Sequence, residues 1–129
     1  MFKYGRTQSQ TVPGPELTVS VSSLDGSRQV GSVVCLIDTA ATTSLLPTSI
    51  VEQLGLNDYD FRRVGWGSGS SDIRRVYAVN LRIGNCVFNR LYVIAAERGH
   101  GLIGRDVLNA HMLTCDGPNK EWTVKPEWL

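Results

Sequence analysis

The sequence has 129 residues, of which 42% are hydrophobic and 19% are charged. This length and composition fit one globular domain with a modest core, and they exclude a disordered chain or a repeat array. Thirteen Lys and Arg residues against twelve Asp and Glu give a formal net charge of +1, so no overall field would recruit nucleic acid or an anionic membrane.

Two strands are predicted in the first third of the chain. Residues 17–22 alternate apolar and hydroxyl side chains, the period-two pattern of a half-buried strand, and residues 24–27 favour a turn. The next predicted strand, 29–37, becomes continuously apolar in its second half, as in a strand that enters the core. This hairpin carries Asp38 to a buried strand end, where an ionised carboxylate is costly unless it is paired or used.

The middle of the chain predicts one short helix and one exposed segment. The helix covers 47–55, with Ser49 and Glu52 at capping-box spacing and Gly55 as its stop. The segment 65–70 has three glycines at every second position, so we expect an exposed loop or hairpin tip there.

The second half of the chain is again mainly strand-like. A short helix is expected at 105–110. Strand patterns occupy 79–83, 87–95, 112–115 and 121–125, with turns at 84–85 and 116–119. The sequence therefore predicts a mostly β fold with one or two short helices, and no linker divides residues 1–129 into separate domains.

Neither a secretory signal nor a membrane span is predicted. The start of the sequence lacks the apolar stretch of a signal peptide, and no apolar run approaches the roughly 18 residues that cross a bilayer. We therefore expect a cytoplasmic protein. The pairs Arg62-Arg63 and Arg74-Arg75 are ordinary charges of solvated strands, although they could contact an acidic partner.

The three cysteines, Cys35, Cys86 and Cys115, are widely spaced among strand-like residues. An odd number at this spacing indicates neither a disulfide framework nor a zinc site. We expect all of them to be buried, reduced thiols.

Three segments, in this order, carry a family resemblance. The first is an apolar strand that ends in Asp38, Thr39, Ala40 and Ala41; the second is the glycine-rich tip Gly65, Trp66, Gly67, Ser68 and Gly69; the third is Leu102, Ile103, Gly104 and Arg105. The trio resembles the retroviral-type (retropepsin-like) single-domain aspartic proteases and their bacterial and retroelement relatives. The resemblance covers about residues 17–116 and implies a closed β-barrel with a flap hairpin, followed by a C-terminal extension at 117–129.

The resemblance implies that Asp38 is catalytic. Aspartic proteases use two carboxylates that share one proton, one acting as a general base on water and the other supporting the developing oxyanion. No second Asp-Thr or Asp-Ser followed by Gly or Ala occurs in the sequence. The second carboxylate must then be Asp38 of another copy, so the resemblance implies a homodimer with the site on its twofold axis.

The other motif residues receive roles from the same resemblance. Thr39 would hydrogen-bond across the twofold axis, although a local bond to the backbone is an equal alternative, and Ala41 would pack beneath the loop. Residues 65–69 would form the flap over a bound peptide, or only a hairpin turn with an exposed tryptophan. Residues 102–104 would cross behind the active-site loop, with Gly104 allowing close backbone approach, and Arg105 would tie the helix to its own subunit.

Two positions depart from the family pattern. Ala40 replaces the usual glycine, and its methyl group would narrow the cleft or strain the loop. Thr42 stands where retroviral relatives carry an acidic partner for Arg105. The C-terminal residues, including Trp122 and Trp128, would form an extra hairpin, a different dimer interface, or a layer on the monomer's own core.

The main functional hypothesis is an aspartic endopeptidase that cleaves extended peptides in a mostly apolar cleft, and the alternative is a catalytically silent module that binds a peptide or protein in the same groove. No cofactor or metal is expected, because His100 and His111 lack neighbours at metal-ligand spacing. The glycines at 65–69 match no nucleotide-binding fingerprint.

Overall fold

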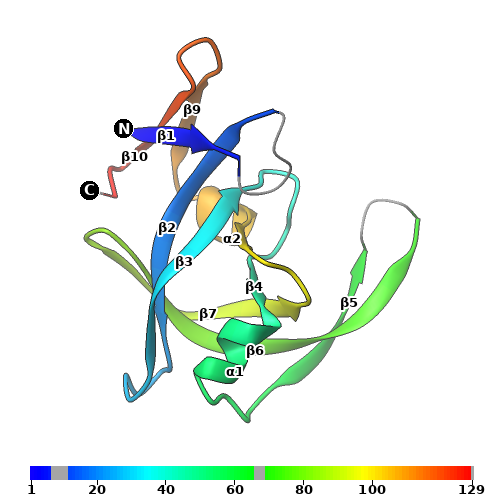
Figure 1. Ribbon diagram of the computed structural model, residues 1–129. Helices are drawn as coiled ribbons and strands as arrows, with labels where there is room; N and C mark the ends of the chain where they lie inside the picture. Colours follow the sequence, from blue (N-terminus) through cyan, green and yellow to red (C-terminus); the bar gives the residue numbers. More distant parts are fainter. Residues whose placement is uncertain (7–11, 66–68, 129) are drawn as a thin grey trace.

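The computed structural model describes residues 1–6, 12–65 and 69–128 (Figure 1). The strands are β1 (Phe2–Gly5), β2 (Gly14–Ser22), β3 (Gln29–Ile37), β4 (Leu45–Pro47), β5 (Asp60–Gly65), β6 (Ser71–Ile83), β7 (Cys86–Ala96), β8 (Gly101–Ile103), β9 (Met112–Asp116) and β10 (Glu121–Lys125), and the helices are α1 (Thr48–Gln53) and α2 (Arg105–Leu108). The prediction of a mostly β fold with short helices is confirmed.

The central strands close into a barrel. Strands β6, β7, β4, β8, β3 and β2 pair in that order, and β2 pairs again with β6. The β3–β8 and β4–β7 pairs are parallel. Closure leaves these strands without an open edge, which protects them from pairing with other chains.

Two hydrophobic clusters fill the fold. The larger cluster includes Leu17, Val19 and Val21 of β2, whose alternation with hydroxyl residues correctly predicted the buried face of that strand. The smaller cluster comprises Leu45, Val76, Ile94, Ala96 and Leu102, with Leu36 and Val64 packed against it. Its members come from β4, β6, β7 and β8, so it ties four barrel strands together.

Helix α1 begins earlier than its predicted cap. Its N-cap is Pro47, no side chain caps it, and Ser49 lies inside the first turn, so the capping-box prediction is wrong. The buried strand β4 runs directly into the helix, and this continuity sets the start. Gly55 follows the helix with a φ of +64°, which confirms the predicted stop.

A long antiparallel ribbon projects from the barrel. Strand β6 begins at Ser71, eight residues before the predicted 79–83 strand, and β5 was not predicted. The two strands pair from Asp60 opposite Val76 to Gly65 opposite Ser71. Figure 1 shows this ribbon, green, curving away from the body on the side of the loop between β3 and β4.

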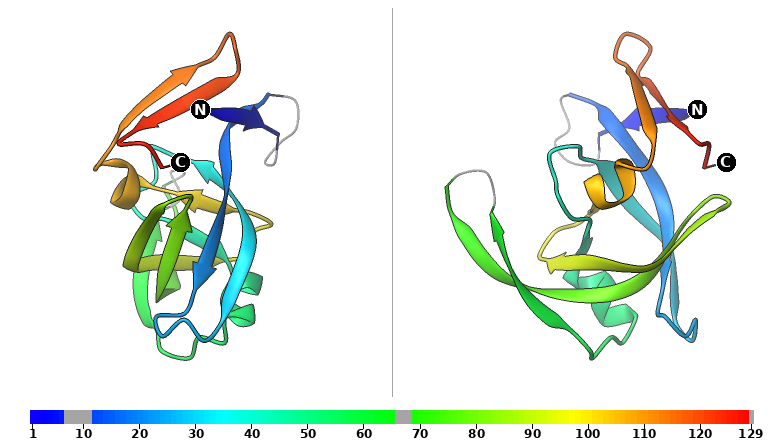
Figure 2. Two further views of the ribbon diagram at one scale, coloured as in Figure 1. Left: turned by 90° about the vertical axis from the view of Figure 1, so that its left-hand side faces the viewer. Right: turned by 180° about the vertical axis from the view of Figure 1, so that it is seen from behind.

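The C-terminal residues pack on the chain's own core. Strands β9 and β10 form a hairpin, and β1 pairs with β10. Trp122 and Trp128 are 1% and 0% exposed, and Phe2 stacks on Trp122 with ring centroids 4.3 Å apart. Figure 2 shows the hairpin, orange to red, at the opposite end of the molecule from the β5–β6 ribbon. Neither helix in the described part of the chain is long and apolar enough to cross a membrane.

The cysteines differ in environment more than the sequence predicted. Cys35 is buried, Cys86 is half-buried and Cys115 is exposed, so the expectation of three buried thiols is wrong. Cys115 is exposed because it lies on β9, the last strand of the sheet order, which has β10 on one side only. Burial raises the pKa of the Cys35 thiol to about 12.

We predict that a thiol reagent at pH 8 modifies Cys115 rapidly in the folded protein and leaves Cys35 unmodified, because Cys35 is buried and stays protonated there. Mass spectrometry of tryptic peptides after timed labelling measures both rates, and labelling in denaturant provides the fully reactive control. Equal labelling of the two cysteines in the folded protein would contradict the structure.

Candidate active site

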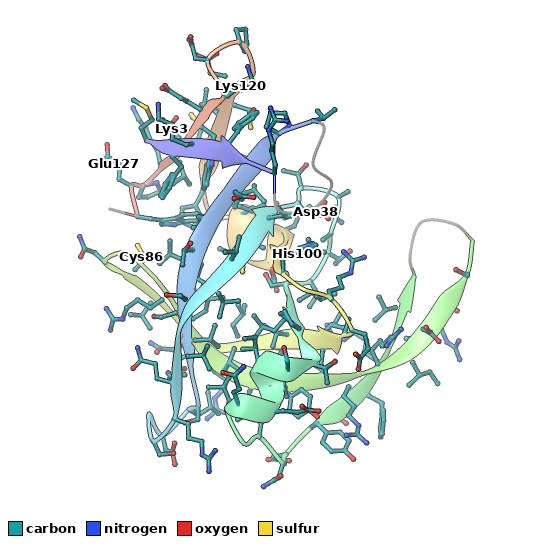
Figure 3. All side chains as sticks on the ribbon, in the orientation of Figure 1. Lys3, Asp38, Cys86, His100, Lys120 and Glu127 are labelled. Atoms are coloured by element: carbon teal, nitrogen blue, oxygen red, sulfur yellow. The ribbon has the colours of Figure 1, made fainter. Side chains whose placement is uncertain are left out.

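Asp38 directly follows β3, at the edge where two parallel strands end. Strands β3 and β8 pair in parallel with Ile37 opposite Ile103, so the residues that follow both strands meet at one edge of the sheet. The Asp38 N–H donates to the Ile103 carbonyl at 3.0 Å. Figure 3 shows Asp38 at this strand end. Asp38 is half-buried, so the predicted buried position at the strand end is only partly reached in a single chain.

The residues after Asp38 form a tight turn. Asp38 Oδ1 accepts a hydrogen bond from the Ala40 N–H at 2.9 Å, and the Asp38 carbonyl accepts one from the Ala41 N–H at 3.2 Å. The turn leaves Thr39 and Ala40 exposed. The Thr39 hydroxyl has no hydrogen-bond partner among the described residues, so the local backbone bond considered for it is absent there.

Arg105 holds this turn in place. Its Nη1 donates to the carbonyls of Thr39 at 2.9 Å and Ala40 at 3.1 Å, and its Nη2 donates to Thr42 Oγ1 at 3.3 Å. The Arg105 N–H also donates to the Ala41 carbonyl at 2.8 Å. Four hydrogen bonds from one residue therefore fix the loop. Thr42 is a neutral hydrogen-bond acceptor for the Arg105 guanidinium.

A second anchor was missed by sequence reasoning. Ser44 is 1% exposed; its N–H and Oγ donate to the two carboxylate oxygens of Asp106 at 2.8 and 2.7 Å. The same Oγ accepts from the Gly104 N–H at 3.0 Å. The available signals were a lone serine before the apolar residues of β4 and an acidic residue in the first turn of α2, but they are 62 residues apart.

Gly104 lies where a side chain would not fit. A Cβ built on this residue would be 2.8 Å from the Ala41 carbonyl oxygen and 3.1 Å from that of Thr43. Both neighbours are backbone atoms of the Asp38 loop, so they cannot rotate away. The glycine lets the strand end and the loop approach closely enough for the Arg105 and Ser44 bonds to form.

Ala40 does not strain the loop. The described non-glycine residues with a positive φ are Arg90 and Lys120, so Ala40 keeps a backbone conformation open to any residue. The expectation of strain is therefore wrong. Ala40 does line the cavity in front of Asp38, where its methyl group takes up space.

A cavity of about 730 Å³ lies beside Asp38, between the loop and the β5–β6 ribbon. Much of its apolar lining comes from the smaller hydrophobic cluster and the residues packed against it, namely Leu36, Leu45, Val64, Ile94 and Leu102. Three arginines also line it, Arg62, Arg63 and Arg98, which the predicted apolar cleft did not include. A larger cavity of about 1000 Å³ near the β2–β3 turn does not include Asp38.

The predicted flap is only partly described. Gly65 ends β5 and lines the cavity, and Gly69 has a φ of +81° and an exposed position. Trp66, Gly67 and Ser68 lie outside the described residues. Leu102, Ile103 and Gly104 are all buried, and of these Leu102 also lines the cavity.

Residues 19–107 match the family model of the aspartyl proteases. The chain belongs to the aspartyl protease family. Among solved structures, the EIAV protease complexed with the inhibitor HBY-793 is similar, with a TM-score of 0.60 and 19% sequence identity over 80% of this chain and 92% of that chain. This similarity confirms the retropepsin-like fold. No curated protein matches the sequence.

Few ionisable side chains line the described cavity of this member of the aspartyl protease family. Within the described ranges, no group of three or more His, Cys, Asp and Glu residues could hold a metal ion. Burial, together with the charge of Arg98, lowers the pKa of His100. The His100 imidazole, which does not line the cavity, is therefore mainly neutral at pH 7. Asp38 is the one carboxylate among the described cavity residues.

We predict that Gly104→Ala destabilises the aspartyl protease by about 1–3 kcal/mol, because the added methyl group collides with backbone of the Asp38 loop. The control is Gly31→Ala, whose Cβ would meet nothing within 4 Å and which we expect to be neutral or slightly stabilising. Urea unfolding measures both free energies. Equal stabilities for the two variants would show that the contact at Gly104 is not tight.

We predict that Arg105→Lys frees the loop, because an ammonium group cannot make the forked contacts to Thr39 and Ala40. Hydrogen exchange of residues 38–44 should become faster, with a loss of about 1–2 kcal/mol in unfolding free energy. Arg82→Lys, on an exposed position of β6, serves as the control. Unchanged exchange in the Arg105 variant would contradict the bracing role.

Proposed function

We propose that the chain is an aspartic endopeptidase that acts as a homodimer, with two Asp38 carboxylates on the twofold axis. The observation that carries this proposal is the position of Asp38, which lines an open cavity on a loop braced by Arg105 and Ser44. Membership of the aspartyl protease family supports the chemistry. The EIAV protease, whose fold is similar, was solved in complex with an inhibitor, which is consistent with a ligand-binding site in this fold.

The homodimer follows from the chemistry of the carboxylate. One ionised and one protonated carboxyl group are needed close together, and Asp38 has no acidic neighbour among the described cavity residues. Asp72, an acidic residue of the ribbon, is paired with Arg74 at 3.0 Å. The exposed Thr39 and Ala40 suit a loop that is covered by a second copy, where the Thr39 hydroxyl would find its partner.

The proposed reaction needs no covalent intermediate. The ionised carboxylate takes a proton from water, and the water oxygen bonds to the carbonyl carbon of the peptide. The protonated carboxylic acid donates its proton to the carbonyl oxygen, which stabilises the tetrahedral intermediate. When the intermediate collapses, the C–N bond breaks, and the carboxyl group that took the water proton donates it to the amine nitrogen. The other carboxylate takes a proton from a hydroxyl of the intermediate as the new carboxylic acid forms, which restores the starting protonation states of both groups.

The ribbon would act as the flap. Between β5 and β6 the sequence contains Gly65, Trp66, Gly67, Ser68 and Gly69, and we propose that these residues close over an extended peptide and exclude water. Residues 102–104 would support the active-site loop from behind. The whole chain, 1–129, would work as one domain, with a core at about 17–116 and the extension 117–129 completing the terminal hairpin.

Ala40 bears on whether the protein cleaves or only binds. Its backbone is compatible with the loop, which favours a working active site over the silent binding module. The remaining effect of the methyl group is to narrow the cavity. We propose that it restricts the substrate rather than abolishing hydrolysis.

We predict that Asp38→Asn lowers peptide cleavage by about a thousandfold, because an amide cannot accept the proton of the attacking water. Asp58→Asn, at an exposed position outside the Asp38 cavity, should keep full activity. Cleavage of a quenched fluorescent peptide mixture measures the rates, and sedimentation equilibrium should show that both variants still form dimers.

Two results would overturn the proposal. The first is cleavage that survives Asp38→Asn, and the second is activity per chain that stays constant on dilution into the monomeric range. A wild-type protein that cuts nothing while Ala40→Gly cleaves would identify the chain as the silent peptide-binding module.

A further inference from the structure

The cavity beside Asp38 carries more positive charge than the chain as a whole. The chain has a formal net charge of +1, yet the described residues that line this cavity include three arginines and one carboxylate, that of Asp38. The rest of the lining is apolar, small or a hydroxyl residue. A bound peptide would therefore meet positive charge on an apolar surface, where water is displaced and charge interactions strengthen.

Arg62 reaches from the ribbon towards the active-site loop. Its Nη1 donates to Thr43 Oγ1 at 3.3 Å, and Thr43 lies five residues after Asp38. This contact uses one of the five N–H groups of a guanidinium and has a neutral acceptor. A substrate carboxylate is a stronger acceptor, because ionised partners give shorter and stronger hydrogen bonds.

The arginines of the ribbon are not equivalent. Neighbouring residues of a strand point to opposite faces, so Arg62 and Arg63 face different sides of β5. Arg63 Nη1 donates to Ser71 Oγ at 3.2 Å, and Ser71 pairs with Gly65, two residues further along. Arg63 also lines the cavity, but its guanidinium is held by Ser71 along the ribbon, whereas Arg62 donates to the active-site loop. This difference favours Arg62, together with Arg98, which lines the cavity from another element.

On the basis of the proposed function, we propose that Arg62 and Arg98 select substrates with acidic side chains. Arg62 comes from β5 and Arg98 from the connection between β7 and β8, so they approach the cavity from two elements. In a twofold dimer each arginine occurs once on either side of the scissile bond. The preferred substrate is therefore a peptide with Asp or Glu on both sides of the cleaved bond and apolar residues nearer to it.

The test uses two fluorescent peptides of the same length and with the same apolar residues, one with Glu and one with Lys on both sides of the central bond. Fluorescence anisotropy with the Asp38→Asn variant, which should not cleave them, gives the two dissociation constants. We expect at least about tenfold tighter binding of the Glu peptide, since each exposed charge pair contributes about fivefold at low salt. The difference should shrink in 0.5 M salt through screening.

Charge-reversed variants assign the effect to the two arginines. Arg62→Glu with Arg98→Glu, in the Asp38→Asn background, should reverse the preference towards the Lys peptide. Arg82→Glu makes the same kind of charge change on an exposed part of β6 outside both cavities and should leave the preference intact. Equal binding of the two peptides, or a Glu preference that survives the double reversal, would overturn the inference.

Cleavage by the wild-type protein separates this inference from the proposed function. Cleavage of a peptide library without enrichment of Asp or Glu around the cut bond would overturn the specificity and leave the endopeptidase intact. Binding of the Glu peptide that depends on Arg62 and Arg98, with no cleavage of any peptide, would overturn the endopeptidase and support the acidic preference of the cleft. An oligonucleotide with the same net charge as the Glu peptide serves as a competitor. If it displaces the Glu peptide with an affinity equal to that of the peptide itself, selection for acidic peptides would be overturned.

Discussion

The contact between the Asp38 loop and the junction of β8 with α2 is the constraint on which the site depends. At Gly104 the two segments are so close that a Cβ would collide with backbone. That closeness lets Arg105 reach three acceptors of the loop and lets Ser44 join Gly104 to Asp106. Because each of these groups is held by another, the carboxylate of Asp38 is positioned before any substrate arrives, which is what preorganised catalysis requires.

The Asp38 loop lies beside an apolar part of the barrel, and Asp38 itself is partly accessible to solvent. The smaller hydrophobic cluster, which includes Leu45, Ile94 and Leu102, forms part of the cavity wall. A half-buried carboxylate is solvated and needs no partner for folding. The proposed second copy is therefore needed for the reaction and not for the stability of the barrel, and its arrival would bury Asp38 and complete the cleft.

The residues that line the cavity would set the substrate specificity of the proposed enzyme. Ala40 lines the cavity without distorting the loop, and Arg62 and Arg98 bring positive charge to a lining that is largely apolar. Cross-strand neighbours Arg62 and Arg74 are like charges directly opposite each other, an arrangement that disfavours the ribbon. Asp72 offsets part of this cost through its ion pair with Arg74, which leaves Arg62 for the cleft.

The sequence by itself determined the strand pattern of β2 and β3, the stop at Gly55 and the position of Asp38 at a strand end, because these depend on local periodicity and backbone preference. It also showed that a second motif aspartate is absent. Only the tertiary structure decided the Ser44–Asp106 anchor, the relaxed backbone of Ala40, the exposure of Cys115 and the side of the ribbon on which Arg62 lies. These features depend on partners as far as 62 residues away or on where a strand falls in the sheet, and no local pattern encodes either.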